Sequence, residues 1–253
     1  MELSIVIPVK NQSEKLLRHL KEELFPYFDK QGLSYEVVIC SDASNPENQK
    51  ILVDAMAYLP SNVRLLPYEE TKGKGHAVKK GLLLAQGDYS LFLDADFATD
   101  LKAFDLIKPE LKNYDAFIGS RNAKGAKILT KQGFVRRILH WGARTLIRMK
   151  FGLKVHDTQC GYKLFRSDVA KLMAKHQTID GFAFDAEYCY FLKLNGFKVK
   201  ETPVYWSDDP DSTVKKPLKT SMNFYKDLRL IKKRKKSYIL TENEKKELAN
   251  VNR

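Results

Sequence analysis

The chain has 253 residues, of which 43% are hydrophobic and 30% charged, so it can bury a substantial core and is not a low-complexity sequence. Lys and Arg outnumber Asp and Glu by 44 to 31, and the net charge of +13 predicts a polyanionic partner such as phosphate, nucleic acid or an acidic membrane. The three scattered cysteines have no metal-ligand spacing and indicate reduced thiols, and no run approaches the ~18 apolar residues that span a bilayer. Because the N-terminus moves straight into a strand pattern, no signal peptide is expected, and the predicted location is cytoplasmic.

The first 120 residues alternate between strand and helix patterns. Apolar or alternating runs predict strands at residues 3–9, 35–41, 62–68, 89–93 and 114–120, with helix patterns between them. This alternation predicts an α/β fold with a Rossmann-like, mostly parallel central sheet and helices on both faces. Ligands of such sheets bind beyond the carboxyl ends of the strands. The polar clusters of the sequence lie at those ends, at Asn11, Asp42, Lys72–Gly75, Asp94, Asp96 and Arg121.

Residues 121–154 contain ten Lys or Arg residues and no acidic residue. From Phe134 the pattern predicts an amphipathic helix with a basic face, which fits an anionic membrane surface. A helix packed on the core with a solvated basic face explains the segment equally well. Residues 224–236 form a second basic stretch with helical spacing, for which the same two interpretations are open.

Asp94 and Asp96 follow the strand at 89–93, and the alternation of strand side chains places them on the same side. Two neighbouring carboxylates repel unless a cation neutralises them. A divalent metal that also binds substrate phosphates meets this need, because Mg²⁺ is commonly held by one or two carboxylates plus phosphate oxygens. A helix-capping or turn-forming cluster is the structural alternative.

The segment "ETKGKGHAVKKG" at 70–81 places Gly73 and Gly75 just before a helix, where backbone N–H groups and lysines can receive a diphosphate. Its spacing matches neither the Rossmann glycine pattern nor a P-loop, which counts against a dehydrogenase or an ATPase. Asp42, after the second strand, is placed to bind a nucleobase or ribose. An ordinary helix-entry loop and a turn-forming Asp remain open as alternatives for these two features.

Eight segments occur in the order seen in glycosyltransferase family 2, and together they cover roughly residues 3–230. They are "SIVIPVKN", "YEVVICSDAS", "TKGKGHAVKKG", "DADFAT", "AFIGSR", "DTQCGYKLF", "GFAFDAE" and "VKETPVYW". The chain most resembles the dolichyl-phosphate β-glucosyltransferase branch, and "DTQCGYKLF" at 157–165 is the most specific segment. The resemblance implies a GT-A fold, a nucleotide-diphosphate sugar donor (UDP-glucose foremost), Mg²⁺ or Mn²⁺, inversion at the anomeric carbon and a polyprenyl- or dolichyl-phosphate acceptor.

The resemblance also implies the roles of individual residues. Nucleotide-sugar binding is expected of Pro8, Val9, Asn11, Asp42, Lys72, Gly73, Lys74, Asp94 and Ala95. Asp96, supported by Asp94, is expected to hold the metal. Arg121, Arg136 and Arg137 are expected to bind the acceptor phosphate. Asp96, Asp157 and Asp185 are the catalytic candidates, with Glu187 as a competing acid whose alternative role, like that of Asp185, is helix-terminal charge stabilisation.

Several positions depart from the family pattern, among them "IPVKN" in place of the commoner "IPVYNE". Ser41 and Ala43 flank Asp42 where the family has an Asp and a Gly, and Phe97 stands where the branch usually has glycine. Eukaryotic members also begin with a membrane anchor that is not seen here. Residues 1–214 are expected to form the catalytic domain, with 121–154 facing acceptor and membrane, and 215–253 a basic helical tail.

The predicted function is therefore transfer of glucose to a polyprenyl phosphate by a peripheral enzyme on the cytoplasmic face of a membrane. Another donor, GDP-mannose or UDP-N-acetylglucosamine, and a soluble or glycan hydroxyl acceptor are alternatives. A basic nucleic-acid-binding protein is a remote alternative, because no nucleic-acid module is recognisable and no nucleic acid is expected as a partner.

Overall fold

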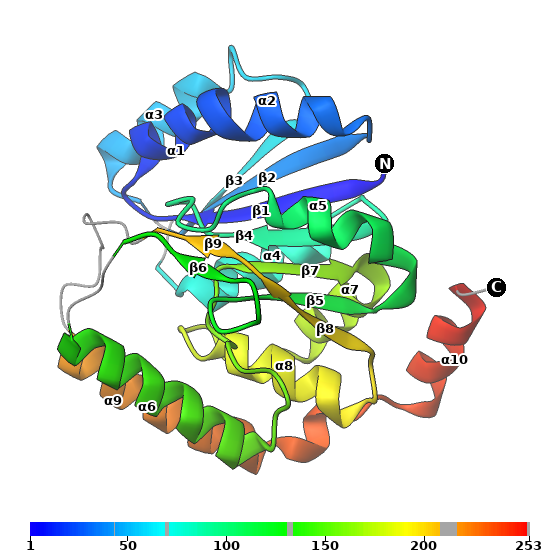
Figure 1. The fold of residues 1–253 in the computed structure, drawn as a ribbon. Coiled ribbons are helices and arrows are strands. Elements are labelled where there is room, and N and C mark those ends of the chain that lie inside the picture. The colour runs from blue at the N-terminus through cyan, green and yellow to red at the C-terminus, as the bar shows by residue number, and fades with distance from the viewer. Residues whose placement is uncertain (43, 69–70, 131–133, 208–216, 252–253) are drawn as a thin grey trace.

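A seven-stranded sheet forms the centre of the protein in the computed structural model, which describes residues 1–42, 44–68, 71–130, 134–207 and 217–251. The strand order is β3-β2-β1-β4-β7-β5-β8 (Figure 1). In chain order these strands are β1 (Leu3–Val9), β2 (Tyr35–Asp42), β3 (Val63–Tyr68), β4 (Tyr89–Leu93), β5 (Ala116–Ser120), β7 (Tyr162–Arg166) and β8 (Val199–Pro203). The short strands β6 (Lys127–Ile128) and β9 (Tyr205–Trp206) pair separately.

The first five strands confirm the sequence prediction of a mostly parallel sheet. β1 pairs in parallel with β2 on one side and β4 on the other. Its side chains alternate between two cores, with Ile5 and Ile7 in one and Val6 in the other, as expected of a strand covered on both faces. The exception is β7, which is antiparallel to both β4 and β5.

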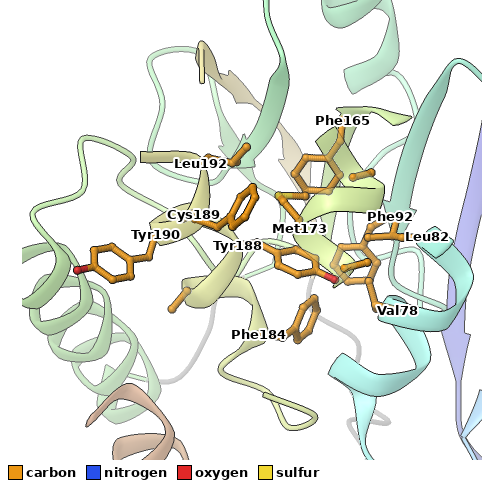
Figure 2. Close-up of a cluster of buried hydrophobic side chains, with 14 of the residues drawn as sticks. Val78, Leu82, Phe92, Phe165, Met173, Phe184, Tyr188, Cys189, Tyr190 and Leu192 are labelled. Atoms are coloured by element: carbon orange, nitrogen blue, oxygen red, sulfur yellow. The ribbon is translucent and has the colours of Figure 1, made fainter. Parts of the chain in front are cut away.

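Helices cover both faces of the sheet. They are α1 (Ser13–His19), α2 (Phe25–Phe28), α3 (Pro46–Ala55), α4 (Lys74–Leu84), α5 (Ala103–Ile107), α6 (Phe134–Phe151), α7 (Ser167–His176), α8 (Phe184–Leu194), α9 (Pro217–Lys233) and α10 (Glu242–Val251). A π-helical turn at Leu20–Leu24 joins α1 to α2. One core lies between the sheet and α1, α2, α3 and α5; the other, shown in Figure 2, lies between the sheet and α4, α7 and α8.

The C-terminal segment packs on this second core. α9 lies beside α6 (Figure 1) and buries Leu228 and Ile231, and the following turn buries Tyr238. The polar last residues form α10, where Glu244 Oε1 lies 2.8 Å from Nε2 of His176 on α7. The described part of the tail is helical through α9 and α10. The proposed boundary at residue 214 falls outside the described residues.

Candidate active site

The carboxyl ends of β1, β2 and β4 lie at one edge of the sheet, because these strands are parallel neighbours. Asn11, Asp42 and Asp94 therefore gather at this edge, as the sequence predicted. Pro8 and Val9 are the buried last residues of β1. The side-chain oxygen of Asn11 accepts a 2.7 Å hydrogen bond from the backbone of the loop after β2, which ties the ends of the two strands together.

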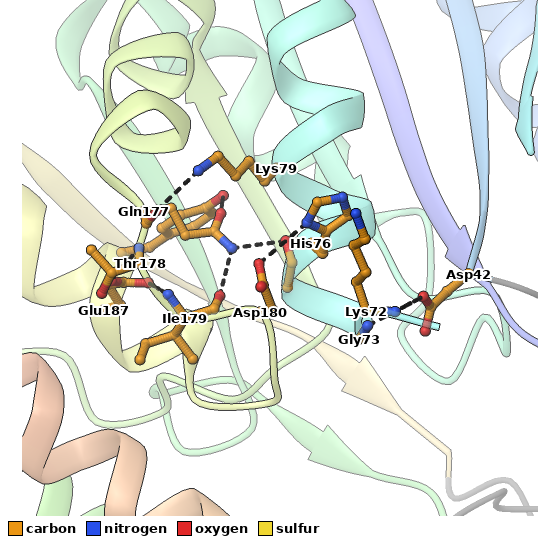
Figure 3. A network of polar contacts seen from close by, with 12 residues as sticks. Asp42, Lys72, Gly73, His76, Lys79, Gln177, Thr178, Ile179, Asp180 and Glu187 are labelled. Carbon is orange, nitrogen blue, oxygen red and sulfur yellow. Dashed lines mark hydrogen bonds and ion pairs between the residues drawn. The ribbon is translucent and has the colours of Figure 1, made fainter. Parts of the chain in front are cut away.

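Asp42 organises the loop before α4. Its Oδ1 accepts hydrogen bonds from the backbone N–H groups of Lys72, at 3.0 Å, and Gly73, at 3.2 Å (Figure 3). Its Oδ2 lies 3.8 Å from Nζ of Lys10. The glycine-containing loop is thereby brought to the end of β2, where the predicted nucleotide-binding residues Asp42, Lys72 and Gly73 form one group.

Asp94 forms an ion pair with Lys74, the first residue of α4, with 2.6 Å between Oδ1 and Nζ. Burial lowers the pKa of Lys74, but the carboxylates of Asp94, Asp185 and Asp96 outweigh it and raise the pKa above its ordinary value. The other side of the Asp94 carboxylate rests on Gly161, where a Cβ would lie 2.1 Å from Oδ2. Glycine in "DTQCG" thus makes room for the first aspartate of the D-x-D motif.

The turn after β4 carries Ala95, Asp96 and Phe97. Oδ1 of Asp96 accepts a 3.0 Å hydrogen bond from the backbone N–H of Ala98. Phe97 has a φ of +49°, in the left-handed region that favours glycine, and its ring stacks on His19 with 4.9 Å between centroids. The glycine of the family pattern is the residue that this backbone conformation favours, and in this chain a buried aromatic stack accompanies the exception.

The donor set of Asp94 and Asp96 suits a hard divalent cation, because both offer carboxylate oxygens. Within the described residues, no group of three or more His, Cys, Asp and Glu side chains is arranged to hold a metal ion. A cation held by Asp94 and Asp96 would need further ligands, and a substrate diphosphate or water would supply them, as is common for Mg²⁺.

Asp185, at the start of α8, lies behind the D-x-D aspartates in a buried charge cluster. Its Oδ1 accepts a 2.5 Å hydrogen bond from Nζ of Lys163, whose side chain is fully buried on β7. Burial raises the pKa of Asp185, and the charges of Lys163 and Lys74 oppose this. The Nζ atoms of both lysines lie 5.4 Å from the centroid of the Phe92 ring. Asp185 therefore connects to Asp94 through a lysine rather than facing solvent.

Arg121 and Asp157 form a buried bidentate pair. Nε of Arg121 lies 2.7 Å from Oδ2, Nη2 lies 2.9 Å from Oδ1, and the Arg121 backbone N–H also donates to Oδ2. The Arg121 guanidinium lies 5.3 Å from the centroid of the Trp206 ring. Burial favours the protonated acid, but Arg121 outweighs it and holds the pKa of Asp157 below its ordinary value. A carboxylate with this environment orients Arg121 and is a weak proton acceptor.

Arg144 on α6 interacts electrostatically with this pair. Burial and the charge of Arg121 lower the pKa of Arg144, while Asp157 opposes the shift. Arg136 and Arg137 also lie on α6, but their side chains are outside the described part of the structure. Sequence reasoning noted Arg144 only as part of a basic helix face and did not name it as a site residue. Helical spacing alone does not tell which Arg turns toward Asp157.

Comparisons with known proteins bear on the fold and on the family of this chain. Glucosyl-3-phosphoglycerate synthase from Mycobacterium tuberculosis, solved with UDP, superposes with a TM-score of 0.63 at 15% identity, covering 95% of this chain and 82% of that one. Another complex of that enzyme contains Mn²⁺, UDP and glucosyl-3-phosphoglycerate, with a TM-score of 0.62 at 13% identity over 95% and 81% of the two chains. The fold is thus that of GT-A glycosyltransferases, as predicted.

The glycosyl transferase family 2 model matches residues 4–173. The dolichyl-phosphate β-glucosyltransferase of Dictyostelium discoideum is 30% identical over 237 residues, or 89% of this chain and 72% of that protein. The Saccharomyces cerevisiae protein of the same name is 30% identical over 249 residues, or 91% and 74%. The chain belongs to glycosyltransferase family 2 and is a glycosyltransferase, which excludes the nucleic-acid-binding alternative as its primary function.

Proposed function

We propose that this glycosyltransferase moves glucose from UDP-glucose onto the phosphate of a polyprenyl lipid of the dolichyl-phosphate type, with inversion at the anomeric carbon. The names of the relatives that are 30% identical over most of the chain support this acceptor and sugar. Within the structure, the observation that carries the proposal is the position of residues 157–161. This one segment contacts Asp94 through Gly161 and Arg121 through Asp157, so it joins the donor and acceptor halves of the site.

The donor half lies at the ends of β1, β2 and β4. Asp42 and the loop at Lys72 and Gly73 offer groups for the nucleoside, and Lys72 and Lys74 offer positive charge for the diphosphate. Mg²⁺ or Mn²⁺ at Asp96, supported by Asp94, would supply charge that stabilises the leaving diphosphate. The Mn²⁺ complex of the structural relative supports a divalent ion of this kind.

The acceptor half is built on Arg121. An oxygen of the lipid phosphate attacks the anomeric carbon as the bond from that carbon to the diphosphate oxygen breaks, and UDP leaves. A phosphate monoester has a second pKa of about 6 and is largely ionised at neutral pH, so the step needs no general base. Asp157 therefore orients Arg121, and Arg121 with Arg144 attracts the phosphate. Asp185 does not contact the substrates in this proposal. It holds Lys163 by a hydrogen bond and Lys74 by its charge.

The membrane-facing surface is the outer side of α6 and α9. Each helix turns one apolar stripe into the core and leaves a second in solvent: Leu146 and Met149 on α6 are 39% and 78% exposed, and Met222 and Tyr225 on α9 are 62% and 47% exposed. Basic residues flank these stripes, as on helices that lie in a membrane interface. No helix among the described residues has the length and apolar character needed to cross a bilayer. The proposed location is the cytoplasmic face of a membrane, bound to anionic lipid.

The test is transfer from a panel of radiolabelled nucleotide sugars in the presence of Mg²⁺ or Mn²⁺, with polyprenyl phosphate or a soluble glycan as acceptor. We expect label from UDP-glucose to enter the organic extract, and only when polyprenyl phosphate is present. Label from GDP-mannose or UDP-N-acetylglucosamine in that extract would show that UDP-glucose is not the donor. Label on the soluble glycan would show that the acceptor is not a polyprenyl phosphate.

A further inference from the structure

The donor-binding loop rests directly on a second loop, at residues 177–181, with almost no space between the two backbones. A Cβ at Gly73 would lie 2.4 Å from the Asp180 carbonyl oxygen, and one at Gly75 would lie 2.7 Å from that of Ile179. Gly73 also has a φ of +118°, which disfavours any other residue. The glycines of the donor loop therefore serve this contact between loops as well as the approach of a diphosphate.

Hydrogen bonds fix the contact between the two loops (Figure 3). Gln177 donates from Nε2 to the carbonyl oxygens of Gly75, at 2.9 Å, and Ile179, at 2.6 Å. The backbone N–H of His76 donates to the Asp180 carbonyl oxygen at 3.2 Å. Nδ1 of His76 lies 3.3 Å from Oδ1 of Asp180. A displacement of residues 177–181 would consequently displace the loop that holds Lys72 and Lys74.

Glu187 holds the 177–181 loop from the other side. Its carboxylate, only 1% exposed, accepts hydrogen bonds from the backbone N–H and Oγ1 of Thr178, at 2.8 and 2.7 Å, and from the backbone N–H of Ile179, at 3.1 Å. Burial raises the pKa of Glu187, and the hydrogen bonds from Tyr238 and Thr178 oppose the shift. This acid, a competing catalytic candidate by sequence, is buried and binds Thr178, Ile179 and Tyr238.

Tyr238, which follows α9, completes the arrangement. Its hydroxyl donates to Oε1 of Glu187 at 2.6 Å and lies 2.9 Å from Oγ1 of Thr178. Asn195 holds the backbone around Tyr238 by two hydrogen bonds: it donates to the Tyr238 carbonyl oxygen and accepts from the Leu240 backbone N–H. A continuous set of contacts thus runs from the C-terminal tail through Glu187 and residues 177–181 to the donor loop.

We propose that Tyr238 and Glu187 are positioning residues for the nucleotide-sugar site, so that the C-terminal tail sets the affinity for the donor. The inference rests on the proposed role of residues 72–76 in binding the donor. α9 carries the proposed membrane surface on one side and leads into Tyr238 at its end.

Tyr238→Phe tests the proposal, because it removes one hydroxyl and keeps the buried ring. We expect the donor KM to rise about tenfold, the factor that corresponds to the ~1.4 kcal/mol of a hydrogen bond to a charged acceptor. The acceptor KM and kcat should change less than about twofold, within the scatter of an uncoupled substitution. The matched control is Tyr190→Phe, another buried tyrosine, on α8. Its ring packs on Phe151 and lies edge-on to Tyr238, with 6.3 Å between centroids, and phenylalanine keeps both ring contacts while removing only a hydroxyl.

Hydrogen exchange of residues 72–79 gives a readout that does not depend on transfer. Exchange there should accelerate in Tyr238→Phe and in Thr178→Val, which removes the second hydroxyl from Glu187, and should not accelerate in Tyr190→Phe. If exchange in 72–79 stays at the wild-type rate in both variants, the coupling is wrong. Equal rises in donor and acceptor KM would also overturn it, because they indicate general loosening. If no donor is turned over but exchange accelerates as described, the proposed function fails and the coupling stands.

Discussion

Lys74 and Asp94 form an ion pair at 2.6 Å, at the point where the proposed diphosphate loop meets the proposed metal site. Lys74 supplies a positive charge beside the D-x-D aspartates from within the chain. With Lys163, it sets two lysines against the three carboxylates of Asp94, Asp96 and Asp185. A divalent cation and a diphosphate entering this site must share Asp94 with Lys74 or draw Lys74 away from it.

Lys74→Met is therefore expected to have opposite effects on metal binding and on transfer. Loss of the competing ammonium should tighten binding of Mn²⁺ to the nucleotide-free protein. Transfer should fall about 100-fold, the usual scale when a group that stabilises developing charge is removed. Titration calorimetry with Mn²⁺ and initial-rate assays measure the two effects. Lys80→Met, at an exposed position of the same helix, is the control; a variant with unchanged metal affinity and rate would refute the shared role of Asp94.

Asp157→Asn tests the buried pair with Arg121 through its pH dependence. Because the pKa of Asp157 is lowered in the folded protein, the pair's contribution is fully present above the unfolded value of 3.8 and is lost as the pH falls through the lower folded value. The variant should lose ~3 kcal/mol of unfolding free energy at pH 7, as expected for a broken buried pair, and progressively less below about pH 4.

Denaturant titrations of the wild type and the variant at pH 7 and below about pH 4 measure this difference in unfolding free energy. Asp54→Asn, which breaks the exposed pair with Lys50, is the control and should cost only ~0.3–0.5 kcal/mol. The rate of transfer by the wild-type protein should show no inflection from Asp157 between about pH 5 and 9, since the pKa of Asp157 is lowered from its ordinary value of 3.8 and so lies below that window. An inflection that disappears in Asp157→Asn would instead identify Asp157 as the general base.

At position 97 a glycine variant should be more stable than an alanine variant, the reverse of what is usual in regular secondary structure. Both substitutions remove the stack on His19, but only glycine relieves the φ of +49°. We expect Phe97→Gly to be more stable than Phe97→Ala by about 1 kcal/mol, although both are less stable than the wild type. Unfolding in urea measures the difference. A more stable alanine variant would show that residue 97 does not hold the left-handed conformation.

The exposed apolar stripes of α6 and α9 predict salt-sensitive binding to anionic vesicles. The protein should float with phosphatidylserine liposomes at low salt and be released at high salt, because the basic residues act through screened charge. Met149→Glu should reduce the bound fraction by placing a carboxylate in the stripe. Val53→Glu, at an exposed position of α3, should leave it unchanged. Retention of wild-type binding by Met149→Glu would exclude α6 as the membrane surface.

The sequence predicted the parallel half of the sheet because each of those strands is an apolar or alternating run with a helix pattern after it. It did not predict β7 as an antiparallel strand between β4 and β5, since "YKLFR" gives no signal of direction. Fully buried Lys163 lies on that strand. Its pairing with Asp185 depends on a contact between residues 22 positions apart, which no local pattern encodes.

The site residues also divide into those that a local sequence pattern predicts and those that depend on long-range packing. Asp42, Asp94 and Asp96 were predictable because a strand end places them at a known edge of the sheet. The ion pair of Lys74 and the link from Tyr238 to Glu187 were not, because both depend on how helices and the tail pack. The family pattern drew attention to Phe97, and only the backbone conformation explains why glycine is usual there.

The measurement that tests the central claim most directly is the rate of glucose transfer to polyprenyl phosphate by Asp96→Ala. Asp100→Ala, which removes a nearby acid of the same loop, serves as the matched control. The account predicts that Asp96→Ala loses transfer and metal-dependent binding of UDP while it still folds and unfolds within about 4 °C of the wild type, since one hydrogen bond to Ala98 is lost. Asp100→Ala is predicted to keep transfer. Wild-type turnover by Asp96→Ala would contradict the assignment of the D-x-D aspartates to the metal and the diphosphate.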